Sequence, residues 1–352
     1  MSTKFNGMPV KKIIRKSIIC FATVLFAVES ASSITPRRDV EPIIIDGMTM
    51  GTTYHITYFD KQQRNFKTAV DSLLQDVNRA INNYDPLSEV SLFNATATGI
   101  SFQLPHLLPV LKKSEEIFRA SDGAFDLTVM PLVNAWGFGP AKARQLSSHE
   151  IDSIRNFIGF EKLQLSELGI QKSDPRIQLD LGGIGQGYGV DVIADFFRKQ
   201  GIENFLVELG GEGIASGKNL KKNKYWQIGI LDPNSTQEEQ FFKAYVTLKN
   251  QSFTTAGNYF NYRVIDGRKY GHTIDPKTGY PVINELLSVS VFASDCTTAD
   301  GWDTAFIAMG LAKTFEFLDR SPAFEVILMY STPQGKIEMF VTPGLRPVTQ
   351  FE

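Results

Sequence analysis

The feature that most constrains this chain is a run of glycines between residues 182 and 189. Five of these eight positions are glycine: Gly182, Gly183, Gly185, Gly187 and Gly189. Glycine adds no side chain to a core and loses more backbone entropy on folding than any other residue. Such a run is therefore expected where the backbone approaches another group closely or adopts a positive φ.

The residues on either side of this run predict a strand end, a glycine turn and the start of a helix. Asp180 precedes the turn, and apolar residues follow it at helical spacing: Val190, Ile193, Ala194 and Phe197. A helix N-terminus presents free N–H groups and the positive end of the helix dipole, which suits a phosphate. A tight turn that packs a helix onto a sheet explains the glycines equally well.

Two familiar phosphate-binding motifs are excluded. A P-loop requires Lys and then Ser or Thr after its last glycine, and neither is present. The dinucleotide pattern GxGxxG fails because Gly183 and Gly185 would require glycine at the position of Tyr188. The formal net charge of −2 shows no excess that would favour nucleic acid, so any phosphate recognition is expected to be local.

Cysteine and histidine usage excludes other kinds of site. The chain has only two cysteines, Cys20 and Cys296, so neither a disulfide framework nor a cysteine metal site is expected. The 4 histidines are scattered, which argues against a zinc site built from histidine. Any metal in this chain is therefore expected to have oxygen ligands.

The N-terminal 33 residues are typical of a targeting segment. Four basic residues, Lys11, Lys12, Arg15 and Lys16, precede an apolar run from Ile18 to Val28 and then small residues. We interpret residues 1–33 as a secretory signal peptide, with an uncleaved N-terminal anchor as the alternative. Cys20 follows Ile19, where a lipidation site would have a small residue, and this argues against a lipoprotein. Residues 40–352 are therefore expected to act outside the cytoplasm, in the periplasm, with attachment to the inner membrane as an alternative to a free form.

Periodicity in the rest of the chain predicts an α+β fold. Helical spacing occurs at residues 66–81, 107–120 and 298–309, and strand patterns occur at 52–59, 205–209, 225–231 and 287–293. Residues 88–94 are expected to form a polar loop, and residues 140–150 a surface connection. Because helices and strands intermix without a regular βαβ period, we expect a single intimately packed unit of mixed sheets and helices.

The helix predicted at residues 298–309 has one acidic face. Asp300, Asp303 and Thr304 lie opposite its apolar residues, with Asp300 and Thr304 one turn apart. Carboxylate and hydroxyl oxygens suit Mg²⁺, which shares its ligands with substrate phosphates. Spacing alone favours the plainer explanation, in which Thr297 caps the helix and the acidic face is solvated.

His272 and several aromatic residues are further candidates. His272 lies between a predicted strand and a turn, where it could be structural or could accept a hydroxyl proton. Tyr84, Trp136, Tyr188 and Tyr259 lie near glycine or aspartate rather than inside apolar runs. They could stack on a planar ligand or could be half-buried surface residues.

Ordered motifs in this chain resemble those of the ApbE family, the FAD:protein FMN transferases. The motifs lie at residues 50–52, 123–126, 136–139, 180–188, 207–212, 272–281 and 298–304, within a similarity that spans roughly residues 43–345. The resemblance implies a secreted, often lipid-anchored protein that binds FAD and Mg²⁺. It also implies transfer of FMN to a Thr or Ser hydroxyl of a partner flavoprotein, with release of AMP. The expected acceptors are subunits of membrane redox complexes or periplasmic electron carriers.

The resemblance also implies the site residues. The metal ligands would be the Gly185 carbonyl, Asp300 and Thr304, with Asp303 as a further candidate. Contacts to FAD would come from Met50, Tyr84, Leu87, Ser88, Asp126, Trp136, Asp180, Gln186, Tyr259 and His272. Either His272 or Asp300 could deprotonate the incoming hydroxyl, although a metal-bound Asp300 would be a poor base.

Two departures and two alternative functions remain. Gln186 stands where the family often has Lys, so the affinity for FAD could be lower, and the leader lacks a convincing lipidation motif. FAD could be hydrolysed to FMN and AMP by water, or it could be bound without turnover. The acidic face of Asp300, Asp303 and Thr304 argues against mere storage, because a flavin carrier needs no metal at the diphosphate.

Overall fold

The computed structural model describes residues 41–352 except 141–145, 237, 258–261, 266–267 and 322. For residues 262–265 and 268–270 we consider the backbone only. The described residues belong to one compact unit. The predicted leader, residues 1–33, lies outside them. Within the described part of the chain, no helix has the length and apolar character needed to cross a bilayer.

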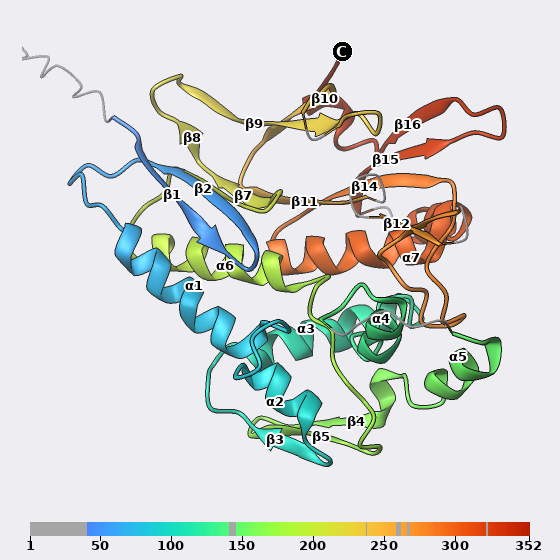
Figure 1. The fold of residues 1–352 in the computed structure, drawn as a ribbon. Helices are drawn as coiled ribbons and strands as arrows, with labels where there is room; N and C mark the ends of the chain where they lie inside the picture. Colours follow the sequence, from blue (N-terminus) through green and yellow to red (C-terminus); the bar gives the residue numbers. More distant parts are fainter. Residues whose placement is uncertain (1–40, 141–145, 237, 258–261, 266–267, 322) are drawn as a thin grey trace, which may run out of the picture. The chain divides into compact units, whose positions relative to one another are not determined.

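The largest element among the described residues is an antiparallel sheet of eight strands (Figure 1). In spatial order the strands are β1 (Ile43–Thr49), β2 (Thr52–Tyr58), β6 (Phe205–Leu209), β7 (Glu212–Ser216), β11 (Gln251–Gly257), β14 (Leu286–Ala293), β15 (Glu325–Ser331) and β16 (Ile337–Val341). Each neighbouring pair is antiparallel. The strands follow one another across the sheet in the order of the sequence, from β1 at one edge to β16 at the other, so the sheet draws on nearly the whole described chain.

The first hairpin places Met50 at its tip. Thr49 pairs with Thr52 across a loop of two residues, Met50 and Gly51, whose φ angles are 50° and 75°. Two positive φ values are the signature of a type I′ turn, whose twist matches that of the flanking strands. The turn brings Met50 against the first turns of the central helix α6, as described below.

Two helices that follow one another along one face of this sheet carry the site (Figure 1). Helix α6 (Gly185–Lys199) packs on β6 and β7, and α7 (Cys296–Arg320) packs on β11 and β14. Helix α7 is kinked at Gly310, whose φ is 76°. Helix α1 (Lys67–Ile81) lies beside α6 and buries Val70, Leu74 and Val77 at helical spacing.

A second sheet covers the opposite face of the main sheet. Its strands are β8 (Lys218–Asn219), β9 (Lys224–Leu231), β10 (Phe242–Leu248) and β17 (Thr349–Phe351). Trp226, Ile230 and Val246 from this sheet share a buried cluster with Phe253 and Phe292 of the main sheet. A separate pair, β12 (Tyr262–Ile265) and β13 (Arg268–Gly271), forms a hairpin.

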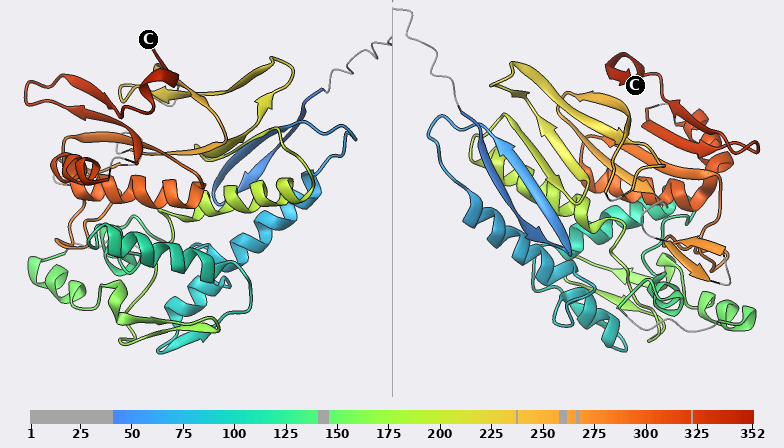
Figure 2. Two further views of the ribbon diagram at one scale, coloured as in Figure 1. Left: turned by 180° about the vertical axis from the view of Figure 1, so that it is seen from behind. Right: turned by 45° about the horizontal axis from the view of Figure 1, so that its top comes forward.

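The remaining elements lie on the other side of α6 and α7 (Figure 2). They are α2 (Glu89–Ala95), α3 (Leu107–Ala120), α4 (Met130–Trp136), α5 (Ser148–Arg155), the 3₁₀ turn η1 (Phe160–Lys162) and a sheet of β3 (Gly99–Ser101), β5 (Gly169–Lys172) and β4 (Leu163–Leu165). A short 3₁₀ turn, η2 (Arg346–Val348), precedes β17. The main cluster of buried apolar residues joins these elements to α7 and β14.

The structure confirms the α+β class and corrects three local predictions. Residues 88–94 largely form α2, because Ser88 caps its N-terminus and Val90 and Phe93 are buried. The segment predicted as a surface connection contains the start of α5, which begins with a capping box of Ser147 and Glu150. No strand leads into the glycine run; the bridge between Val129 and Gln178 is isolated, and beyond it the Asp180 N–H donates to the Leu127 carbonyl at 2.7 Å.

Candidate functional site

The glycine run lies where α6 and α7 overlap in opposite directions. The Gly187 N–H donates a hydrogen bond of 2.8 Å to Asp300 Oδ2. Gly183 lies against Thr304, because a Cβ atom built on Gly183 would be 2.7 Å from Thr304 Oγ1. Gly185 lies between these two glycines on α6. The predicted ligands Gly185, Asp300 and Thr304 therefore belong to one helix junction.

Close approach, not unusual backbone conformation, explains these glycines. None of the five has a positive φ. A Cβ on Gly187 would lie 2.4 Å from the Cys296 carbonyl oxygen and 2.7 Å from Asp300 Cβ. Any side chain there would push α6 away from α7. The glycines thus allow two helix N-termini, both with positive dipole ends, to meet.

The acidic face of α7 is buried, which overturns the prediction of a solvated face. Asp300 is 5% exposed and Asp303 is 2% exposed, since the sheet and α6 cover this face of the helix. The predicted cap is also corrected. The helix begins at Cys296, and Asp295, not Thr297, caps it by accepting the Thr298 N–H at 2.8 Å.

A third carboxylate, which sequence reasoning did not select, faces this pair. Glu212 begins β7, and its pKa is raised well above its usual range by burial and then by repulsion from Asp300 and Asp303. Burial, followed by the charge of Asp300, likewise raises the pKa of Asp303. Burial raises the pKa of Asp300 to about 7 in spite of the Gly187 hydrogen bond. The sequence feature that could have identified Glu212 as a site residue is its place at the end of the motif at residues 207–212.

Within the described part of the chain, no positive side chain pairs with these carboxylates. Among the described residues, no ion pair includes Glu212, Asp300 or Asp303. Glu212 Oε2 and Thr254 Oγ1 are buried without a hydrogen-bond partner of ordinary geometry, although Thr254 lies close enough to Asp303 to lower its pKa. Buried anions require a compensating charge, because their desolvation is costly.

These donors fit a divalent cation with oxygen ligands. Mg²⁺ prefers carboxylate, hydroxyl and carbonyl oxygens, and it retains positions for substrate phosphates. No group of three or more His, Cys, Asp or Glu side chains among the described residues is arranged to hold a metal alone. A cation at this junction would therefore need the Thr304 hydroxyl and a backbone carbonyl as well as carboxylates.

Three predicted flavin-side residues lie around the start of the glycine run. Asp180 Oδ1 accepts the Gly182 N–H at 2.9 Å. Burial raises the pKa of Asp180, and the nearby His272 partly opposes this. Burial, and then the negative charge of Asp180, raise the pKa of Tyr84. Tyr84 is nevertheless 68% exposed. His272 is also exposed. These side chains are therefore available to a ligand that approaches the glycine turn.

Other predicted contacts have structural roles within the protein. Ser88 is fully buried, and its hydroxyl donates to the Asn82 carbonyl and accepts the Ser91 N–H. The contact of Ser88 with FAD stays a prediction, and in this structure its hydroxyl is engaged within the protein. Within this loop, Leu87 is 80% exposed and Ser88 provides the helix cap.

Asp126 and Trp136 hold loops in place. Asp126 is buried, and its Oδ1 accepts both the backbone N–H and the hydroxyl of Thr128 at 2.8 and 2.7 Å. The Trp136 indole N–H donates to the Gly279 carbonyl at 2.9 Å, and its ring lies 5.8 Å from that of Tyr280. The Trp136 ring is half-buried, so one part of it can still contact a ligand.

Met50 and Gln186 approach the junction from the side of the main sheet. A Cβ on Gly189 would lie 3.2 Å from Met50 Cε, so Met50 covers the first turns of α6. A Cβ on Gly210 would lie 2.8 Å from Gln186 Nε2 and 3.2 Å from Glu212 Oε2. The Gln186 amide thus points towards the turn between β6 and β7. Tyr259 lies outside the described residues.

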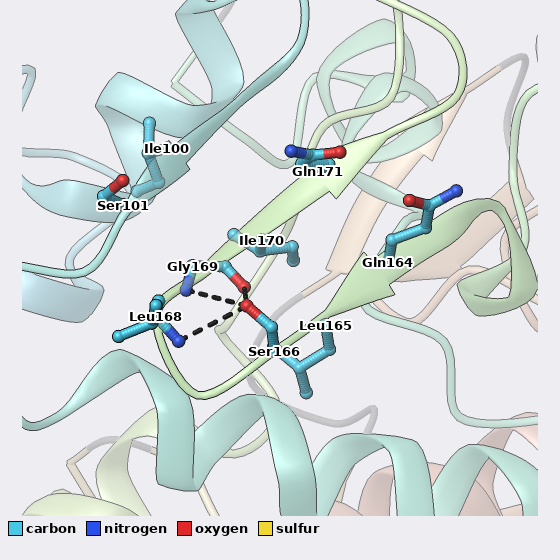
Figure 3. A pocket seen from close by; sticks show the side chains of 9 residues that line it. All are labelled: Ile100, Ser101, Gln164, Leu165, Ser166, Leu168, Gly169, Ile170 and Gln171. Carbon is cyan, nitrogen blue, oxygen red and sulfur yellow. Dashed lines mark hydrogen bonds between the residues drawn. The ribbon is translucent and has the colours of Figure 1, made fainter.

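The described residues also outline a surface hollow that contains none of the predicted site residues. Figure 3 shows it along the sheet of β3, β5 and β4, where Ser166 Oγ accepts the N–H groups of Leu168 and Gly169 at 3.3 and 3.2 Å. Its lining is uncharged and comes mostly from these strands and the turn between β4 and β5. It therefore offers no charge for binding a phosphate.

Replacement of Asp126 by Asn is expected to weaken the dependence of stability on pH. Burial raises the pKa of Asp126 to about 6 from its usual 3.8, so the folded state retains a proton that the unfolded chain releases. This stabilisation is complete below about pH 4 and is lost as the pH rises through about 6. Asp126→Asn keeps an acceptor for Thr128 and removes the titration. Between about pH 4 and pH 6, the free energy of unfolding of the variant should fall by about 2–3 kcal/mol less than that of wild type. Urea denaturation in the presence of a chelator measures both. Identical pH profiles for the two proteins would contradict the burial argument.

Comparisons with known proteins agree on one family. The ApbE family model matches residues 50–328. The FAD:protein FMN transferase of Vibrio cholerae serotype O1 is 36% identical over 306 residues, which cover 85% of this chain and 90% of that protein. The enzyme of the same name from Haemophilus influenzae is 33% identical over 325 residues, covering 88% and 93%.

Solved structures lead to the same group of proteins. The flavin transferase ApbE from Vibrio cholerae superposes with a TM-score of 0.79 at 32% identity and covers 88% of this chain and 99% of its own. The apo form of the flavinyl transferase ApbE from Pseudomonas stutzeri has a TM-score of 0.78 at 29% identity, covering 88% and 97%. The similarity thus extends over nearly the whole described chain.

Proposed function

The chain belongs to the ApbE family, and from this premise we propose that it transfers FMN from FAD to a Thr or Ser hydroxyl of a partner flavoprotein in a Mg²⁺-dependent reaction. It is an enzyme of the flavin transferase class. The observation that most supports the Mg²⁺ dependence is the buried, uncompensated cluster of Asp300, Asp303 and Glu212 at the junction of α6 and α7.

Asp300, Asp303, Thr304 and the Gly185 carbonyl would hold Mg²⁺ in this proposal. When bound, the ion would neutralise the negative charge that develops on the leaving AMP phosphate. The N-terminus of α6 directs its dipole towards the same position, which favours a diphosphate there. The exposed Tyr84 and Leu87 and the half-buried Trp136 would contact the flavin side of FAD.

The proposed reaction breaks the phosphoanhydride bond of FAD and forms a phosphoester bond to the acceptor. The acceptor oxygen bonds to the phosphorus attached to riboflavin, and the bond from that phosphorus to the bridging oxygen breaks, so that AMP leaves with this oxygen. The hydroxyl proton passes to His272, which is exposed and close to Asp180. We assign this role to His272 because Asp300 already accepts the Gly187 N–H and would bind the metal.

A mass measurement on the acceptor tests the transferase proposal. The full-length protein is incubated with FAD, Mg²⁺ and an acceptor domain from a redox-complex subunit, with a chelator in the control. A mass gain equal to one FMN, found only with Mg²⁺, is expected. Free FMN without any gain on the acceptor would instead indicate FAD hydrolysis, and unchanged FAD that stays bound would indicate a flavin-binding protein.

We also propose that residues 1–33 export the protein to the periplasm, where its acceptor would be a subunit of a membrane redox complex or a soluble electron carrier. The support is the basic and apolar pattern of this segment. Fusion of residues 1–40 to a phosphatase that is active only after export tests this. A fusion with no phosphatase activity would refute export by this leader.

Gln186→Lys is expected to stabilise the metal-free protein, since the new ammonium group would lie near the unpartnered Glu212 Oε2. The gain should be about 1–2 kcal/mol, or roughly 2–5 °C in melting temperature. Gln186→Met, which is neutral and of similar length, is the control. Equal melting temperatures for the two variants in the presence of a chelator would show that position 186 does not face Glu212. Tighter FAD binding by the Lys variant would instead place this side chain near the diphosphate.

A further inference from the structure

Asp191 connects α6 to the N-terminus of α7. Its Oδ1 accepts the Cys296 N–H at 2.8 Å. Its Oδ2 accepts the Thr297 N–H at 2.8 Å and the Thr297 hydroxyl at 2.5 Å. The two N–H groups are backbone donors of the kind that a helix leaves unpaired in its first turn. A carboxylate from another helix therefore caps α7, in addition to its own cap, Asp295.

The link between the helices is reciprocal. In the other direction, the Gly187 N–H in the first turn of α6 donates to Asp300 on α7. Gly187 and Asp191 are four residues apart, one turn along α6, so the two contacts lie on the same face of the helix. Each helix thus provides a carboxylate to the free N–H groups of the other. Two such contacts, one turn apart, fix both the separation of the helices and their register.

This register determines whether the metal ligands converge. The Gly185 carbonyl belongs to α6, whereas Asp300 and Thr304 belong to α7. A shift of one helix along the other would separate the carbonyl from the carboxylate and the hydroxyl. Residues that orient metal ligands without binding the metal commonly change metal affinity by about 10- to 100-fold when replaced.

From this geometry we infer that Asp191 is a positioning residue for the proposed Mg²⁺ site. It acts by holding the start of α7 in register with the first turns of α6. The inference rests on the proposed function, because it concerns the metal required for FMN transfer. Asp191 lies on the α6 side of the junction and its carboxylate accepts the N–H groups of Cys296 and Thr297. It is therefore not one of the proposed metal ligands.

Asp295 provides a matched control on the same helix end. Its carboxylate caps the first turn of α7 by accepting the Thr298 N–H at 2.8 Å, and the only other hydrogen bond of this carboxylate among the described residues comes from the Ser294 hydroxyl. Both replacements, Asp191→Ala and Asp295→Ala, thus remove a carboxylate cap from α7. Only Asp191→Ala also removes a connection between the two helices.

The experiment compares Mg²⁺ affinity and kinetics of the full-length variants. Titration calorimetry with Mg²⁺ alone should show a dissociation constant about 10- to 100-fold higher for Asp191→Ala, and within about twofold of wild type for Asp295→Ala. In the transfer assay at saturating Mg²⁺, Asp191→Ala should lower kcat while the KM for FAD stays within about twofold. Asp191→Asn, which retains one acceptor oxygen, should give an intermediate Mg²⁺ affinity.

Three results would overturn the inference or the function on which it rests. Equal loss of Mg²⁺ affinity in Asp191→Ala and Asp295→Ala would mean that Asp191 acts only as a helix cap, as Asp295 does. If Asp191→Ala fails to fold by circular dichroism, Asp191→Asn is compared with Asp295→Asn under the same criterion. A wild-type protein that binds Mg²⁺ but transfers no FMN would refute the proposed function alone, because the affinities would still decide the role of Asp191. A wild-type protein that binds no Mg²⁺ would refute both.

Discussion

Replacement of Asp300 by Ala is expected to abolish FMN transfer and to leave FAD binding largely intact. In the proposed mechanism, Asp300 holds the cation that stabilises charge on the leaving phosphate, and this charge is greatest in the transition state. The loss in kcat should be at least about 100-fold, equivalent to about 3 kcal/mol of transition-state stabilisation. Single-turnover transfer to the acceptor, together with FAD titration by fluorescence, measures the two effects separately.

Asp300→Asn separates loss of charge from loss of structure. The amide oxygen can still accept the Gly187 N–H, whereas the negative charge beside Asp303 and Glu212 is removed. Because burial raises the pKa of Asp300 to about 7 from its usual 3.8, the unfolded chain releases a proton that the metal-free fold retains, and the fold loses stability between about pH 4 and pH 7. The Asn variant should therefore melt no lower than wild type in a chelator above this pH, yet lose transfer. Normal turnover in either variant would remove Asp300 from the metal site.

Gly187→Ala is expected to destabilise the protein and to disturb the junction of α6 and α7. The new Cβ would lie 2.4 Å from the Cys296 carbonyl oxygen and 2.7 Å from Asp300 Cβ, and neither can rotate away. Alanine has the higher helix propensity by about 1 kcal/mol, but overpacking of a well-packed interior costs about 1–3 kcal/mol and occasionally more. The clash should therefore decide the sign, with a net loss of stability of roughly 2 kcal/mol and displacement of Asp300.

The matched control for this prediction is Gly185→Ala, two residues earlier in the same helix. Its Cβ would meet only the far end of the Ile81 side chain, at 3.3 Å, which can move by a few tenths of an ångström. We expect Gly185→Ala to change the free energy of unfolding by less than about 1 kcal/mol. Chemical denaturation of both variants provides the comparison. Equal stability of the two would mean that α6 and α7 do not approach as closely as the structure indicates.

Regular elements could be predicted wherever local periodicity decides the structure. The spacing at residues 66–81 and 107–120 predicted α1 (Lys67–Ile81) and α3 (Leu107–Ala120) closely, because each buries one apolar face. The short helices α2 and α5 were missed. They have only 7 and 8 residues, too few for their apolar positions to stand out, and their caps were the better signal.

For the candidate site, in contrast, tertiary packing decided more than the local sequence pattern. Sequence spacing placed Asp300, Asp303 and Thr304 on one helix face but favoured a solvated face, because burial of that face depends on a distant segment. Only the packing of α7 against β11, β14 and α6 makes these carboxylates buried. Glu212 and Asp191 were not selected for the same reason. Their importance comes from neighbours 88 to 106 residues away, from Asp300 beside Glu212 to Thr297, whose hydrogen bond to Asp191 spans 106 positions.

By itself, the sequence determined the class of the fold and the family and indicated candidate positions for the chemistry, because periodicity, caps and motifs are properties of neighbouring residues. The tertiary structure alone decided how those candidate positions are arranged. It showed that the glycines serve close approach, since none has a positive φ, and that two helix N-termini meet with carboxylates exchanged between them. The physical reason is that desolvation and electrostatic repulsion act through space, so a local pattern of acidic residues cannot reveal which of them will be buried together.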